Sequence, residues 1–489
     1  TGLVSPETGS KVSYASARNK IKLIAFHLNA RGLPPRSKIA VAANNGISSC
    51  LTILGIIYAG HIALPLNLVA GSKIIAYTLD HSETALIFTA DDCEKLISEA
   101  LADFEKEIEV IKLDSQLGPI WEKEAPNETF VKKGNVSAEE IAVIMYTSGT
   151  TGNPKGVMLS HSNLLAAGRY ISSGHEVDHK DTALCILPIY HINGLCVTVM
   201  GTLASAGTLV LPNRFSVNAF WRLIETHRCT WFSAVPTQYS YILNNKLMPE
   251  KIPFLRFARS ASAPLSPEIH RKFEERFKIP IIETMGLTET GSQISTNPLP
   301  PKVRKIGSPG KAFGNKLMIG NEVSDEVAPG TIGEILVKGS NVMKGYFKQP
   351  DETVKTITKE GWLKTGDLGY MDEDGYIYVT GRIKELIIKG GENIAPREVD
   401  EALLDHDSVL EAAAFAVPCA NYGERVEACI IPTESIQLDL EHLLEHCIKS
   451  IGRFKAPEKI HIMNDLPKGP SGKIQRLKLY NLIYPQAKI

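Results

Sequence analysis

Hydrophobic and polar positions alternate in one way in the first part of the chain and in another way near its end. In residues 1–140, short apolar runs such as KIAVAANN and TALIFTA are followed by stretches with the spacing of amphipathic helices. This alternation predicts βαβ units on a mostly parallel sheet. Further strands are predicted at residues 183–187, 208–211 and 231–234, with a helix over 217–227.

The pattern changes after residue 330. The segments GTIGEILVKG and YMDEDGYIYVTG alternate with a period of two, and an Asp-Gly turn interrupts the second, which predicts antiparallel strands. Residues 381–391, GRIKELIIKGG, are charged and bounded by glycine, so we expect a domain boundary there. The two predicted domains are residues 1–381 and 382–489, the second a small α+β domain.

One apolar stretch, CLTILGIIYAGHIALPL at residues 50–66, has to be distinguished from a membrane span. It is short for a transmembrane helix, and it contains His61 and Pro65. We therefore expect a buried core helix there and no transmembrane segment in the chain.

The composition is that of a globular protein of two or more domains, with 489 residues, 44% hydrophobic and 22% charged. The 53 basic and 54 acidic side chains balance, which argues against nucleic acid or an anionic membrane as the main partner. Eight cysteines without a C-x-x-C pair predict reduced, mostly buried thiols and a cytoplasmic location. A peroxisomal location is the alternative, because Ala487-Lys488-Ile489 partly matches the S-K-L signal.

The stretch YTSGTTGNPKGV, residues 146–157, has the residue types of a phosphate-binding loop. It follows an apolar run at residues 141–145 that predicts a buried strand. Its glycines permit close approach of the backbone, its hydroxyls can donate to phosphate oxygens, and Lys155 supplies positive charge. The spacing is not that of a Walker A loop, because Gly156 follows Lys155 where Ser or Thr is required. A P-loop kinase or GTPase is therefore disfavoured.

Five further motifs occur in order along the chain: ETMGLTET (283–290), KTGDLGY (364–370), GRIKE (381–385), GGENI (390–394) and GPSGKIQR (469–476). With YTSGTTGNPKG they resemble, in order and spacing, the adenylate-forming superfamily of acyl-CoA synthetases, adenylation domains and luciferases. PTQYS, RSASAPL and STNPLP are most similar to short acyl-CoA synthetases of the oxalyl-CoA synthetase-like group. The resemblance covers essentially the whole chain. It implies an α/β fold, with a large N-terminal domain of α/β subdomains plus a β-barrel-like subdomain, and a small mobile C-terminal α+β domain.

The resemblance also implies a two-step reaction. A carboxylate attacks the α-phosphate of ATP, which releases pyrophosphate and leaves an acyl-AMP; the thiol of CoA then displaces AMP to give a thioester. The expected ligands are ATP, Mg²⁺, CoA and a small carboxylic acid. A free-standing adenylation enzyme that loads the phosphopantetheine of a carrier protein is the alternative.

The family places cationic and metal-binding groups around the phosphates, because the attacking carboxylate and the triphosphate are both anionic. By resemblance, Lys473 bridges the carboxylate and the α-phosphate, Thr288 contacts the α-phosphate, and Glu289 is the Mg²⁺ ligand. A catalytically silent acyl-binding relative is disfavoured because these groups are present. The residues implied to bind ATP or AMP are Thr147, Ser148, Gly149, Thr150, Thr151, Lys155, Ser262, Ala263, Glu283, Thr284, Met285, Gly286, Asp367 and Arg382.

Lys384 matches the family's hinge, about which the small domain turns between the two half-reactions. The rotation is implied to remove Lys473 from the site and to bring in Gly390, Gly391 and Glu392, which line the thiol tunnel.

The residues implied to line the acyl pocket are small or polar and favour a short or polar acid: His191, Asn193, Thr237, Ser262, Gly286 and Ser292. His191 argues against an α-amino acid, since amino-acid-activating relatives carry an aspartate in that region. Ser292 stands where oxalyl-CoA synthetases have a histidine for the second carboxylate, which argues against oxalate. Met285 replaces an aromatic residue that stacks on adenine in many relatives, although a thioether can also cover a purine face.

A second class of function is raised by His175-Glu-Val-Asp-His179, which matches the H-E-x-x-H motif of zinc hydrolases with Glu176 as the base. That mechanism requires both histidines on one face of a helix. The segment has little apolar periodicity, so a polar loop is the predicted structure.

Overall fold

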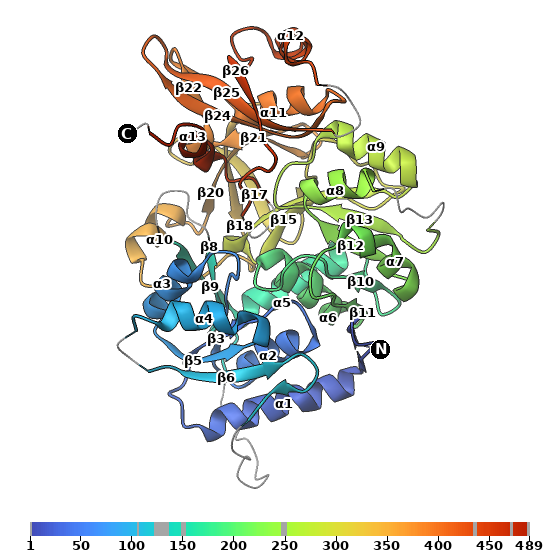
Figure 1. Cartoon of the computed structure of the whole chain (residues 1–489), viewed down its shortest axis with the longest axis vertical. Helices are drawn as coiled ribbons and strands as arrows, with labels where there is room; N and C mark the ends of the chain where they lie inside the picture. The colour runs from blue at the N-terminus through green and yellow to red at the C-terminus, as the bar shows by residue number, and fades with distance from the viewer. Residues whose placement is uncertain are drawn as a thin grey trace.

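The computed structural model describes residues 2–104, 107–121, 136–147, 153–245, 252–433, 438–469 and 473–486. Figure 1 shows a large body, coloured blue to yellow, with a smaller C-terminal domain in orange and red at its top. The predicted α/β class, with a large N-terminal and a smaller C-terminal domain, is confirmed. No helix within these ranges is long and apolar enough to cross a membrane.

An eight-stranded sheet organises the first part of the large body. Its central strands are parallel, as the βαβ pattern predicts. In spatial order the strands are β19 (Gly345–Tyr346), β9 (Lys155–Ser160), β8 (Ile141–Thr147), β4 (Ile62–Pro65), β3 (Lys38–Ala42), β5 (Thr84–Thr89), β6 (Glu109–Asp114) and β7 (Gly118–Pro119). The helices of this part are α1 (Tyr14–Ala30), α2 (Ile47–Tyr58), α3 (Ser72–Ser82) and α4 (Glu94–Leu101).

The apolar stretch at residues 50–66 is divided between helix α2 and strand β4, so the prediction of a single core helix there is wrong. The chain turns at Gly60, whose φ of +82° lies in the left-handed region that favours glycine. Strand β4 is buried between β3 and β8. A continuous apolar run does not by itself separate a buried helix from a buried strand.

A nine-stranded sheet forms the second part of the large body. Its strands are β16 (Lys311–Ala312), β15 (Ser292–Thr296), β14 (Ile281–Leu287), β13 (Phe257–Ser260), β12 (Trp231–Ala234), β10 (Thr182–Leu184), β11 (Thr208–Val210), β1 (Leu3–Val4) and β2 (Lys11–Val12). The helices here are α5 (His161–Gly174), a π-helix (Asn193–Met200), α6 (Gly201–Ser205), α7 (Val217–His227), α8 (Pro236–Leu243) and α9 (Pro267–Phe277). Strand β12 and helix α7 coincide with the predicted ranges, whereas β10 ends at Leu184 rather than at residue 187.

A four-stranded antiparallel sheet follows, where the period-two pattern predicts it. Its strands are β17 (Lys316–Gly320), β18 (Gly333–Lys338), β20 (Leu363–Met371) and β21 (Ile377–Arg382). Helix α10 (Pro350–Thr356) comes before β20 in the sequence. Strands β20 and β21 form a hairpin that ends at the predicted domain boundary.

The C-terminal domain is α+β, as predicted. It contains β22 (Ile387–Lys389), β23 (Glu392–Ile394), β24 (Val409–Cys419), β25 (Gly423–Pro432), β26 (Lys459–Ile462), α11 (Pro396–Leu404), α12 (Leu440–Ile451) and α13 (Leu479–Ile483). It contacts the large body through Tyr241 of α8, which donates to Glu411 Oε1 (2.7 Å) and accepts from Lys468 Nζ (3.2 Å). Lys468 and Glu411 also form an ion pair at 3.0 Å.

The eight cysteines are all free, and all but Cys419 are buried, in agreement with the prediction of reduced thiols. The three C-terminal residues that resemble a peroxisomal signal lie outside the described ranges.

Candidate active site

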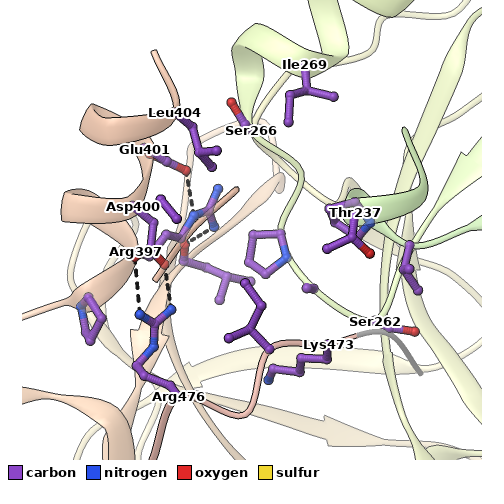
Figure 2. Close-up of a pocket in the computed structure, with 18 of the residues that line it drawn as sticks. Thr237, Ser262, Ser266, Ile269, Arg397, Asp400, Glu401, Leu404, Lys473 and Arg476 are labelled. Atoms are coloured by element: carbon purple, nitrogen blue, oxygen red, sulfur yellow. Dashed lines mark hydrogen bonds and ion pairs between the residues drawn. The ribbon is translucent and has the colours of Figure 1, made fainter. Parts of the chain in front are cut away.

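A cavity of about 220 Å³ lies between the large body and the C-terminal domain, and both contribute to its wall. Figure 2 shows Lys473 on a loop of the C-terminal domain, opposite the segments of the large body that carry Thr237 and Ser262. The sequence-predicted residues that line this cavity are Thr237, Ser262, Ala263, Glu283, Thr284, Met285, Gly286, Asp367, Arg382 and Lys473. Residues more than two hundred positions apart in the sequence, such as Thr237 and Lys473, therefore line one cavity, as the resemblance to the adenylate-forming superfamily implies.

Strand β14 carries the ETMG motif along one wall of the cavity. Gly286 is required there because a Cβ atom would lie 1.7 Å from the carbonyl oxygen of Ser292 on the adjacent strand β15. Glu283 is buried, its Oε2 has no hydrogen-bond partner, and burial raises its pKa. Met285 lines the same wall and is 9% exposed, so it is available to cover a flat ligand.

Asp367 and Arg382 are opposite residues in the register of the β20–β21 hairpin, and this register makes them an ion pair. Arg382 Nε lies 2.5 Å from Asp367 Oδ1. The Asp367 carboxylate raises the pKa of Arg382, and the carboxylates of Glu385 and Glu289 act in the same direction. The pair thus presents a fixed carboxylate and a fixed guanidinium to the cavity.

Lys473 reaches the cavity from the C-terminal domain and is partly buried. Burial lowers the pKa of its ammonium group, as does the nearby Arg382 guanidinium, whereas Glu385 and Asp367 oppose this shift. A desolvated ammonium group beside two fixed charges is suited to stabilise negative charge that develops on a ligand.

Arg476, which the sequence analysis did not single out, anchors the loop that carries Lys473. Arg476 Nη2 lies 2.5 Å from Asp400 Oδ2, and Nε lies 3.5 Å from Glu385 Oε2. Nη1 donates a hydrogen bond to the backbone carbonyl of Ala414. Figure 2 draws the contact with Asp400 on α11. The only sequence signal was its position three residues after Lys473 in GPSGKIQR.

Arg476→Met should loosen the C-terminal domain, because the carboxylate of Asp400, whose side chain is 14% exposed, would lose its partner. Breaking a fully buried pair destabilises by roughly 3–5 kcal/mol, and this partly buried pair should cost less. We expect faster amide hydrogen exchange in α11 and β24 of the full chain. The double variant Asp400→Asn, Arg476→Met removes both charges and should recover most of the protection. Unchanged exchange in the single variant would contradict this anchoring role.

Lys155, one of the predicted phosphate-binding residues that the structure describes, lies outside the cavity wall, where it is connected to a tyrosine and two carboxylates. Lys155 Nζ forms an ion pair with Glu352 and lies 4.9 Å from the ring centroid of Tyr346. The Tyr346 hydroxyl donates to Glu289 Oε1 at 2.9 Å. Lys155 and Lys355 lower the pKa of Glu352 to about 2. Tyr346 therefore joins the predicted phosphate lysine to the predicted metal ligand.

Thr147 ends strand β8 opposite Lys155, and Thr288 begins the 3₁₀ turn that contains Glu289. Ser148, Gly149, Thr150 and Thr151 lie outside the described residues.

Three of the predicted acyl-pocket residues are connected by hydrogen bonds: His191 and Asn193, which lie behind the cavity wall, and Ser262, which lines it. Asn193 Nδ2 donates to Ser262 Oγ (3.2 Å), and its backbone N–H donates to His191 Nδ1 (3.3 Å). Burial lowers the pKa of His191 to about 4, so this side chain is neutral at neutral pH. Ser292 is buried with a φ of +104°, on the strand next to Gly286. A fully buried arginine that the sequence analysis missed, Arg259, also belongs to this network.

The predicted hinge and tunnel residues do not line the cavity. Lys384 is exposed in the 3₁₀ turn Ile383–Glu385, and Gly390, Gly391 and Glu392 are exposed at the turn between β22 and β23.

The structure contradicts the zinc-hydrolase alternative. His175 follows the end of α5 and is buried against Arg259, while Glu176 and His179 are exposed in a turn. The two histidines therefore do not share a helical face. Among the described residues, no group of three or more His, Cys, Asp or Glu side chains has an arrangement that could hold a metal ion.

Comparisons with known proteins identify the family of the chain. The family of AMP-binding enzymes matches residues 2–347, and the AMP-binding enzyme C-terminal domain matches residues 398–473. The sulfoacetate–CoA ligase of Cupriavidus necator is 42% identical, covering 98% of this chain and 94% of its own length. The oxalate–CoA ligase of Arabidopsis thaliana is 35% identical, covering 91% and 88%.

Among solved structures, o-succinylbenzoate CoA synthetase from Bacillus subtilis, in complex with its acyl-adenylate intermediate, superposes with a TM-score of 0.86. It is 28% identical and covers 98% of this chain and 94% of its own. This chain belongs to the family of AMP-binding enzymes, and within it is an AMP-forming acid–thiol ligase that works through an acyl-adenylate.

Proposed function

We propose that this ligase activates a short carboxylic acid that carries a second acidic group, and that CoA is the thiol acceptor. Lys473 lines the same cavity as the Asp367–Arg382 pair, and this is the observation that most supports adenylation at that place. The side chains on the acyl side, Thr237 and Ser262, are small and polar, which favours a short acid. Two relatives are named for sulfoacetate and oxalate, which are short acids of this kind.

In the first half-reaction, an oxygen of the substrate carboxylate attacks the α-phosphorus of ATP while the bond to pyrophosphate breaks. Negative charge develops on the α-phosphate oxygens, and a desolvated cation beside them lowers the barrier. We assign this role to Lys473. Asp367 would accept hydrogen bonds from the ribose, and the unpartnered Oε2 of Glu283 would accept one from the amino group of adenine. Lys155 would bind the β- and γ-phosphates in place of its contact with Glu352.

Glu289 fits the role of a Mg²⁺ ligand. Glu289 is partly exposed, its carboxylate accepts a hydrogen bond from Tyr346, whose ring also contacts Lys155, and it offers the oxygen donors that this ion prefers. A single protein carboxylate suits an ion that takes its other ligands from water and phosphate. Mg²⁺ bound there would neutralise charge on the phosphate oxygens. The contribution of the protein is to orient Glu289 through the Tyr346 hydroxyl.

For the second half-reaction, we propose that residues 382–489 turn relative to residues 1–381 about a hinge at Lys384. The CoA sulfur then attacks the acyl carbon, and the bond to AMP breaks. The exposed position of Lys384 between the two domains supports this hinge. Lys473 lines the cavity, whereas the predicted tunnel residues Gly390, Gly391 and Glu392 do not. This is the arrangement expected before a rotation that would exchange the Lys473 loop for the turn at residues 390–392.

A panel of acids tests this proposal with the purified full chain, ATP and Mg²⁺. We expect sulfoacetate or malonate to give pyrophosphate release well above that with acetate, butyrate or benzoate. Release of AMP should require free CoA. A requirement for a phosphopantetheinylated carrier protein would overturn the assignment of CoA, and a preference for monocarboxylic acids would overturn the acid class.

A further inference from the structure

Arg259 at the end of strand β13 is a buried cation without an acidic partner. Its side chain is 1% exposed. Its guanidinium nitrogens contact only neutral groups: His175 Nε2 at 3.2 Å, Ser233 Oγ at 3.0 Å, Asn193 Oδ1 at 3.4 Å and Gln293 Oε1 at 3.5 Å. None of the ion pairs formed by the described residues includes Arg259.

This arrangement differs from that of Arg476, a partly buried arginine near the site, which is paired with Asp400 and Glu385. A buried charge without a partner is unfavourable, and the guanidinium responds with a pKa lowered to about 9 by burial. Arg259 therefore remains a cation at neutral pH. Burial lowers the pKa of His175 to about 3, so the adjacent imidazole is neutral. The cluster carries one net positive charge.

The charge lies one side chain away from the wall of the cavity. Asn193 Oδ1 accepts hydrogen bonds from Arg259 and from Ser233 Oγ (2.9 Å), and Asn193 Nδ2 donates to Ser262, which lines the cavity. His191, next to Asn193 in this network, is neutral. Water does not screen a charge in this buried region, so its potential extends to the acyl side of the cavity.

We infer that Arg259 is the specificity-determining counter-charge for the second acidic group of the substrate, a carboxylate or a sulfonate. The reacting carboxylate loses its negative charge when it becomes an acyl phosphate, so it has no lasting need for a fixed cation. A second acidic group stays negative through both half-reactions and is stabilised throughout by a permanent positive charge behind the pocket. This inference rests on the proposed function and names the residue that would select the acid.

The test compares acids of nearly equal shape that differ in charge at the far end. Malonate is paired with malonamate, and sulfoacetate with sulfamoylacetate, so that the two pairs also separate a carboxylate from a sulfonate. The ratio of kcat/KM within each pair is measured for the full-length protein, for Arg259→Met and for Arg259→Lys. Arg256→Met is the matched control, because the exposed Arg256 lies three residues away, does not line the cavity, and has a partner of its own in the buried carboxylate of Asp181.

The wild-type protein and Arg256→Met should both prefer the doubly charged acid of at least one pair. Arg259→Met should reduce that preference by about 30-fold or more, and Arg259→Lys should retain part of it. An unchanged ratio in Arg259→Met, with equal loss for both acids, would show a purely structural role and overturn the inference.

If Arg259→Met does not fold, the inference is tested with the kcat/KM ratios of the wild-type protein and of Arg259→Lys. Equal use of the charged and the neutral acid by the wild-type protein overturns the inference. Activation only of other, monocarboxylic acids also overturns it and leaves the ligase reaction intact. Failure of every carboxylic acid to release pyrophosphate would instead count against the proposed function.

Discussion

Lys473→Ala is expected to lower the acid-dependent exchange of pyrophosphate into ATP by roughly 10²–10³-fold, while thioester formation from supplied acyl-AMP and CoA continues. The physical reason is that Lys473 lines the cavity from the C-terminal domain without an ion pair to any described residue, whereas Arg397 and Arg476 beside it are paired with carboxylates. In the proposed second half-reaction the domain would have turned, and the lysine would no longer lie beside the reacting atoms. Its loss should therefore affect one half-reaction and not the other.

Lys478→Ala is the matched control, because Lys478 is an exposed lysine in the same segment. It should leave both half-reactions unchanged. Equal loss of both half-reactions in Lys473→Ala would show that the lysine supports the site as a whole, and the assignment would fail.

Lys384→Pro is expected to give the opposite result: acyl-AMP accumulates and thioester formation falls by at least about tenfold. Proline fixes φ near −65°, which is within the range of the 3₁₀ turn that contains Lys384. The present arrangement, with Lys473 in the cavity, is therefore retained, whereas the rotation about residue 384 is restricted. Single-turnover measurement of acyl-AMP and of acyl-CoA separates the two effects.

Lys384→Ala removes the same side chain but leaves φ free, so it should behave like the unchanged enzyme in both steps. Thioester formation at the full rate in Lys384→Pro would place the hinge elsewhere. Loss of adenylation in the same variant would show damage to the present arrangement.

Those parts of the fold that depend on local pattern could be predicted from the sequence. Helix α7 has apolar residues at helical spacing and strand β12 is a short, fully buried run, and the bounds of both were predicted correctly. The structure of the apolar stretch at residues 50–66 was not predicted correctly. The turn at Gly60 divides it into helix α2 and strand β4, and both of these elements are buried. Periodicity does not identify an element whose faces are all apolar.

The candidate site was predicted as far as its motifs extend. The motifs taken together pointed to Asp367, Arg382 and Lys473, and these three residues line one cavity. No single motif contains all three. Tyr346 and Arg259 were missed because their importance depends on which residues they contact. Tyr346 is joined to Glu289 and Lys155 only by the pairing of β19 with β9, and the absence of an acid beside Arg259 becomes visible only when its neighbours are known.

With the proposed role of Lys155, its ion pair with Glu352 would make nucleotide binding a replacement of one anion by another. The lysine assigned to the leaving phosphates has a carboxylate as its counter-ion, held on helix α10. The arriving phosphates take the place of that carboxylate, and Glu352 can return to Lys155 as pyrophosphate departs. The protein thus carries its own competitor for the first product, which favours release of a highly charged molecule from a cationic loop.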